Sequence, residues 1–169
     1  DIHEVIETLA DPGSFMELRG GFGRGMITGF VRVGGRPLGL IANDPKHLGG
    51  AIDADAADKA TRFINLCDCF DIPILLLCDC PGFMVGIESE AQASLRHMVR
   101  LTRLLPRLRA LLKLTRMPWH AHAWLQCRMM VLGGSVTVPT FCIVTRKAYG
   151  LGAQAMGAGS HHAPNFTVA

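Results

Sequence analysis

A glycine-rich turn near the end of the chain has the clearest chemical potential. The sequence Tyr-Gly-Leu-Gly-Ala at 149–153 follows an apolar run at 140–144 and leads into an alanine-rich segment. When a strand turns directly into a helix, backbone N–H groups at the turn can point into a cleft and stabilise a developing oxyanion. The candidate donors are the main-chain N–H groups of Gly150, Leu151, Gly152 and Ala153. The predicted chemistry therefore lies in the backbone.

A second turn of this kind follows the apolar run at 74–78. Its members are Pro81, Gly82, Phe83, Met84 and Gly86. Glycines permit close approach to the backbone, and the positive end of a following helix favours an anion. For one turn alone, ordinary strand-to-helix packing is the alternative interpretation, because glycine-rich turns are common in α/β folds.

Two further motifs precede these turns, Ile-Ala-Asn-Asp-Pro at 41–45 and Gly-Gly-Ala-Ile-Asp at 49–53. The four motifs, in this order, resemble those of the biotin-dependent acyl-CoA carboxyltransferases. The likeness is to the C-terminal of the two crotonase-like domains in the carboxyltransferase subunit of acetyl- or propionyl-CoA carboxylases. It runs from about residue 11 to the C-terminus and favours the functional interpretation of both turns. It implies an α/β fold, the crotonase/ClpP-like spiral with a layered β-sheet and flanking helices.

The resemblance also implies a reaction and its participants. The carboxyl group would pass from carboxybiotin, held on a carrier domain, to an acyl-CoA, while residues 150–153 hold the biotin oxygen. A separate N-terminal half would bind most of the acyl-CoA. The biotin/CoA cleft would be lined by Pro81, Gly82, Phe83, Met84, Gly86 and Tyr149. The implied partners are an N-terminal carboxyltransferase domain, a biotin carboxyl carrier domain, a biotin carboxylase and further copies of the chain.

No side-chain base is expected, because in this family the biotin enolate is thought to take the acyl α-proton. Asn43 and Asp44 are expected to fix a loop. Arg146 and Lys147 are expected either to reach a CoA phosphate or the biotin carboxylate, or to be surface charges. A Val at Gly152 would block ligand approach and leave most of the core intact.

Three alternative functions stay open. They are a biotin-dependent acyl-CoA decarboxylase, a non-catalytic assembly remnant, and a membrane- or partner-binding module.

Hydrophobic periodicity predicts the elements that would carry these turns. A helix is expected at 2–10, and two strands at 26–33 and 36–42 joined by Gly34-Gly35. A helix at 53–70, capped at its start by Asp53 or a neighbouring Asp, precedes the buried strand at 74–78, whose continuous apolar run is typical of a parallel sheet. A helix from about residue 88 and a strand at 141–145 follow. The two apolar strands should be neighbours in one sheet, with both glycine-rich turns at the same edge.

Four of the six cysteines occur as Cys67-x-Cys69 and Cys78-x-Cys80. Two such pairs could supply the four thiolates of a zinc site. However, the first pair falls in a predicted helix, and the second is expected to point to opposite faces of a strand. The cysteines are therefore expected to be reduced core residues, with no metal bound.

The charge is uneven along the chain, since all 14 acidic residues lie at or before Glu90. The basic second half would face phosphates, an acidic partner or solvent. A basic, leucine-rich stretch at about 103–129 departs from the family pattern and is expected either to cover the core, to contact a partner or a membrane, or to be a gene-model artefact.

The length of 169 residues fits a single domain, with residues 1–169 forming part of a C-terminal carboxyltransferase domain. The absence of an initiator Met suggests a fragment. An apolar content of 49% favours an oligomer. Nucleic-acid binding and membrane contact are not expected. The expected compartment is the cytoplasm, or the mitochondrial matrix in a eukaryote.

Overall fold

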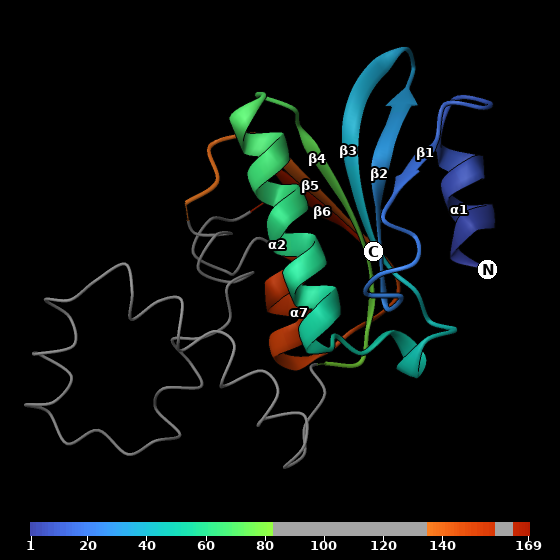
Figure 1. Ribbon diagram of the computed structural model, residues 1–169, viewed down its shortest axis with the longest axis vertical. Helices are drawn as coiled ribbons and strands as arrows, with labels where there is room; N and C mark the ends of the chain where they lie inside the picture. The colour runs from blue at the N-terminus through green and yellow to red at the C-terminus, as the bar shows by residue number, and fades with distance from the viewer. Residues whose placement is uncertain (83–134, 158–163) are drawn as a thin grey trace, which may run out of the picture.

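The computed structural model describes residues 1–82, 135–157 and 164–169 (Figure 1). The helix expected from about residue 88, the basic stretch at 103–129 and the turn residues Phe83, Met84 and Gly86 lie outside these ranges.

A six-stranded mixed sheet forms the centre of the described structure. Its strands, in spatial as well as sequence order, are β1 (Met16–Leu18), β2 (Met26–Val33), β3 (Arg36–Asn43), β4 (Ile74–Cys80), β5 (Thr140–Ala148) and β6 (Phe166–Val168). The first three strands pair antiparallel, and β3 to β6 pair parallel. The predicted strands are confirmed, and both apolar strands extend further toward their turns than the sequence pattern indicated. The short strands β1 and β6 had no clear sequence signal.

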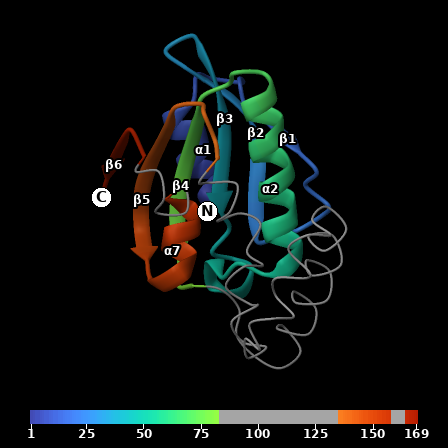
Figure 2. The ribbon, with the colours of Figure 1, turned by 90° about the vertical axis from the view of Figure 1, so that its left-hand side faces the viewer.

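The described residues also form three helices and a short 3-10 turn. They are α1 (Ile2–Leu9), η1 (Leu48–Gly50), α2 (Ala54–Cys69) and α7 (Gly150–Met156). Figure 2 shows α2 and α7 together on one face of the sheet and α1 on the other. The expected start of α2 is confirmed, since the Asp53 side chain accepts a hydrogen bond from the Ala56 N–H at 2.7 Å.

The β2–β3 hairpin turns at Gly34 and Gly35, whose φ angles are +57° and +77°. Two consecutive positive φ values are what a type I′ hairpin turn requires, which explains the glycine pair. The carboxylate of Asp11 accepts hydrogen bonds from both glycine N–H groups, at 2.9 and 2.7 Å. This side chain therefore ties the end of α1 to the hairpin.

The sheet separates two apolar clusters. Under α2 and α7, residues such as Ile41, Phe63 and Met156 pack together, while Ile2, Ile6 and Leu77 pack under α1. All seven residues of β4 are buried, which reflects this two-sided cover and matches the continuous apolar run at 74–78.

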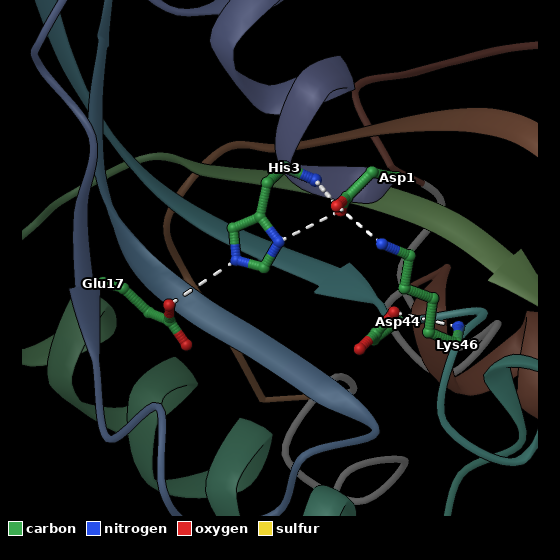
Figure 3. Close-up of polar contacts among 5 residues, drawn as sticks. All are labelled: Asp1, His3, Glu17, Asp44 and Lys46. Carbon is green, nitrogen blue, oxygen red and sulfur yellow. Dashed lines mark hydrogen bonds and ion pairs between the residues drawn. The ribbon is translucent and has the colours of Figure 1, made fainter.

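Polar contacts at the surface join α1 to the sheet (Figure 3). The carboxylate of Asp1 lies 2.7 Å from Lys46 Nζ and 3.2 Å from His3 Nδ1, while His3 Nε2 lies 3.6 Å from Glu17 Oε2. These exposed pairs connect the N-terminus with β1 and the loop after β3. Exposed ion pairs each contribute little, about 0–1 kcal/mol, so apolar packing does most to hold α1 in place.

The cysteines on β4 correct one expectation from the sequence. Cys78 and Cys80 do not point to opposite faces, because both are buried in the cluster under α2 and α7 together with Cys67 and Cys142. Side chains two residues apart share one face of a strand, so the expectation was wrong. The described cysteines are free thiols.

Candidate functional site

Three turns leave the carboxyl ends of the parallel strands β3, β4 and β5 and meet at one edge of the sheet. β4 and β5 are hydrogen-bonded neighbours, which confirms the predicted arrangement of the two apolar strands. The Tyr149 N–H donates to the Cys80 carbonyl at 3.0 Å, and the Ile52 N–H donates to the Gly82 carbonyl at 3.1 Å. The motifs at 49–53, 79–82 and 149–153 are therefore joined by backbone contacts.

Gly152 lets two of these turns touch. A Cβ added there would lie 2.5 Å from Cys80 Sγ and 2.8 Å from the Gly82 Cα. Because the second contact is with backbone, a rotamer change could not relieve it. The expectation that Val at Gly152 leaves most of the core intact is therefore wrong. Gly50 has a similar role, since an added Cβ would overlap the Asp79 carbonyl.

The first turn of α7 provides the candidate donors. The Ala153 N–H already donates to the Tyr149 carbonyl at 3.3 Å, which closes the first helical turn. The N–H groups of Gly150, Leu151 and Gly152 precede this bond, so the helix offers them no acceptor. Gly150 has a φ of +57°, and an added Cβ would meet no atom of the described residues within 4 Å. Open space is therefore found at Gly150, whereas Gly152 is packed.

The turn after β4 uses its own polar groups internally. The Gly82 N–H donates to Cys80 Sγ at 3.3 Å, and the Cys80 thiol donates to the Gly82 carbonyl at 3.3 Å. In the described part of this turn, Gly82 therefore provides close backbone packing, while Pro81 is exposed. Tyr149, named with these residues as lining the cleft, is 61% exposed at the same edge.

A buried polar group beside these turns was missed by the sequence interpretation. Asp79 is 5% exposed, and its carboxylate accepts hydrogen bonds from Arg146 Nε at 3.1 and 3.3 Å. Its N–H donates to Asn43 Oδ1 at 3.3 Å, and Asn43 is fully buried. Asn43 Nδ2 has no hydrogen-bond partner in the described structure. Two features of the sequence could have revealed this pair: an Asp at the end of an apolar strand and an Arg shortly before the second glycine-rich turn.

The thiols near the site are poor nucleophiles at neutral pH. Burial raises the pKa of Cys78 to about 12, and it also raises the pKa of Cys80 above its usual range. A thiol must lose its proton to act as a nucleophile or a metal ligand. Within residues 1–82, 135–157 and 164–169, no group of three or more His, Cys, Asp or Glu side chains is placed to hold a metal ion. None of the helices in these ranges is long and apolar enough to cross a membrane.

Comparison with known proteins places this arrangement in a family. Residues 1–103 match the carboxyl transferase domain. The chain is 37% identical over 150 residues to the biotin-dependent acetyl-/propionyl-coenzyme A carboxylase beta5 subunit of Mycobacterium tuberculosis (strain CDC 1551 / Oshkosh), covering 89% of this chain and 22% of the relative.

Two solved structures show the same fold. A single-chain, multi-domain long-chain acyl-CoA carboxylase has a TM-score of 0.78 at 46% identity over 98% of this chain and 14% of its own. The transcarboxylase 12S hexamer with methylmalonyl-coenzyme A and methylmalonic acid has a TM-score of 0.71 at 33% identity, over 92% of this chain and 25% of its own. The fold is thus crotonase-like, as expected.

The chain spans 22–28% of the length of the first five curated relatives. The matched residues include β1 to β4 and the turn after β4, and the structural matches extend through β5 and α7. On this sequence match and these structural matches, the chain belongs to the carboxyl transferase domain family.

Proposed function

We propose that this chain is the C-terminal half of a carboxyltransferase site that moves a carboxyl group from carboxybiotin to an acyl-CoA. The observation that carries the proposal is the first turn of α7, whose free N–H groups lie at the sheet edge where three turns meet. Relatives named as biotin-dependent acyl-CoA carboxylases support the reaction class.

The main-chain N–H groups of this chain would stabilise the negative charge that develops during the reaction. Carboxybiotin supplies the carboxyl group, and its ureido oxygen gains negative charge as that group leaves. The N–H groups of Gly150 and Leu151 would donate to this oxygen, since neither has an acceptor in the helix. The absence of a Cβ at Gly150 leaves room for the approach.

The contacts that hold this turn keep the donors fixed. The Tyr149 N–H donates to the Cys80 carbonyl, and Gly152 packs closely against the backbone of Gly82. Donors that are already oriented need no reorganisation when charge develops, which is the basis of oxyanion stabilisation. Among the described residues, Pro81, Gly82 and Tyr149 would form part of the wall against which the acyl-CoA and biotin meet.

The proposed partners follow from the half-site. An N-terminal carboxyltransferase domain would supply most of the acyl-CoA contacts, a carrier domain would deliver biotin, and a biotin carboxylase would charge it. An acetyl- or propionyl-CoA type substrate is supported by the names of relatives, and a multimer by the hexamer of the 12S structure.

The test is a transfer assay with the chain alone and with an N-terminal carboxyltransferase half from a relative. Carbon-14 from labelled free carboxybiotin should appear in acetyl- or propionyl-CoA only when both halves are present. Carboxybiotin decarboxylation, measured separately, should also require this chain. A stable complex of the two halves that catalyses neither reaction would exclude the proposal and leave a role in assembly.

A further inference from the structure

A buried ion pair lies directly before the α7 turn. The side chain of Asp79 is 7% exposed, and its cationic partner is Arg146, whose side chain is 56% exposed. A carboxylate this deeply buried depends on its partner, because an unpaired charge away from water is strongly unfavourable. The pair therefore constrains the backbone on both strands.

The arginine belongs to an irregular part of β5. Cys78 is opposite Val144, and Cys80 is opposite Ala148. Between these two pairs lie one residue of β4, Asp79, and three residues of β5. Three residues of β5 consequently bulge out opposite Asp79. Bulges of this kind occur beside functional sites, where they redirect the chain that follows.

Three contacts hold the bulge against β4. Thr145 Oγ1 donates to the Cys78 carbonyl at 3.2 Å, and the Cys78 thiol donates weakly to the Lys147 carbonyl at 3.7 Å. The third contact is the Arg146–Asp79 pair, which alone is charge-assisted and therefore the strongest of the three. Two residues after Lys147, the Tyr149 N–H donates to the Cys80 carbonyl, and α7 begins.

The pair cannot act through direct side-chain packing on Gly152. Asp79 follows Leu75 and Leu77 on the α1 face of the sheet, whereas Cys80, which contacts Gly152, is on the α7 face. Its influence on the turn must pass through the backbone of the bulge. From the other side, Asn43 Oδ1 holds the Asp79 N–H, which fixes the carboxylate relative to β3.

We propose that Arg146 is a positioning residue, which holds the β5 bulge through Asp79 and thereby aims the N–H groups at the start of α7. The effect on turnover rests on the proposed carboxyltransferase function, but the effect on the turn does not. A shift of about 1 Å in reacting groups can lower a rate by about 100-fold, so a relaxed bulge would matter for catalysis.

The variants separate positioning from simple stability. Arg146→Met leaves the buried carboxylate unpaired, and Asp79→Asn removes the charge. The double variant Asp79→Asn/Arg146→Met has neither charge. Arg146→Lys keeps the positive charge without the planar donor group. Arg32→Met, an exposed arginine on β2, is the matched control.

Two readouts are needed on the whole chain. Amide hydrogen exchange of Tyr149 and Ala153 reports on the turn without any substrate, because both N–H groups are hydrogen-bonded there. The melting temperature and the kcat and KM for carboxybiotin decarboxylation, with the N-terminal half present, report on stability and catalysis.

We expect Arg146→Met to lower the melting temperature and the double variant to recover most of it. In the double variant, exchange at Tyr149 and Ala153 should still be about 10-fold faster, and kcat about 10- to 100-fold lower, with KM changed less than threefold. The exchange rates and kcat of Arg146→Lys should lie between those of the wild type and the double variant. Those of Arg32→Met should match the wild type. Wild-type exchange and wild-type kcat in a stable double variant would overturn the proposal. Faster exchange in a system whose wild type shows no turnover would support positioning and refute the carboxyltransferase function.

Discussion

Replacing Leu151 with Pro removes one candidate oxyanion donor with little disturbance of the fold. Leu151 is the second residue of α7, and its N–H has no acceptor within the helix. Proline is tolerated in the first turn, because the residue four positions earlier, Lys147, is in β5 and presents no helical carbonyl to its ring. Gly150 has no Cβ, which relaxes the usual restriction on the residue before proline.

The expected loss follows from the number of hydrogen bonds. One donor to the oxyanion disappears while no intramolecular bond is lost, so the free energy of unfolding should change by less than about 1 kcal/mol. Loss of one oxyanion donor in other enzymes costs about 10²- to 10³-fold in kcat, or about 2.7–4 kcal/mol of transition-state stabilisation. Leu151→Ala retains the N–H and shortens the 38%-exposed side chain, so it should reduce kcat by less than about threefold.

The measurement is carboxybiotin decarboxylation and acyl-CoA carboxylation in the two-half system, with melting temperatures recorded for each variant. Both reactions should slow in Leu151→Pro, because both develop charge on the same biotin oxygen. A folded Leu151→Pro protein that works as fast as Leu151→Ala would refute the assignment of this N–H as a donor. Equal and large losses in the two variants would instead assign the effect to the leucine side chain.

Three further outcomes follow from the structure. Gly152→Val should destabilise the protein by at least about 1–3 kcal/mol in urea unfolding, because its Cβ would overlap the neighbouring turn; wild-type stability would show that the two turns can separate. In iodoacetamide labelling at pH 8, exposed Cys69 should react in the native protein, whereas Cys78, whose pKa burial raises to about 12, should react only after denaturation. Hydrogen bonding from the Thr137 backbone N–H lowers the pKa of Asp68 below its ordinary 3.8, so the carboxylate stabilises the fold above that pH. Asp68→Asn should therefore lower the urea midpoint at pH 7, and the difference should narrow as pH falls below 3.8; a pH-independent difference would contradict this cause.

The main elements were predictable because their signals are local. The positive-φ turn at Gly34-Gly35, the Asp53 cap and the continuous apolar run at 74–78 each specify a structure within a few residues. The short strands β1 and β6 gave no comparable signal, since three residues cannot establish an alternating pattern. Their pairing depends on partners that are distant in the sequence.

The candidate site was only partly predictable for the same reason. Glycine-rich turns at two strand ends indicated where the site would be, and the parallel sheet brought them to one edge. The sequence did not show that Cys80 and Gly82 occupy the space beside the Gly152 Cα, because that contact depends on the spacing of β4 and β5. The Asp79–Arg146 pair was missed because its partners are 67 residues apart.

The register between β4 and β5 therefore determines the site as much as the glycines do. Leu76 is opposite Cys142, and this alignment together with the bulge after Val144 brings the Cys80 carbonyl to the Tyr149 N–H. A slip of one residue would turn the side chains of one strand to the other face and move the Gly152 contact away from Cys80. Core residues that fix this register, although they touch no ligand, are thus a requirement for aligning the backbone donors.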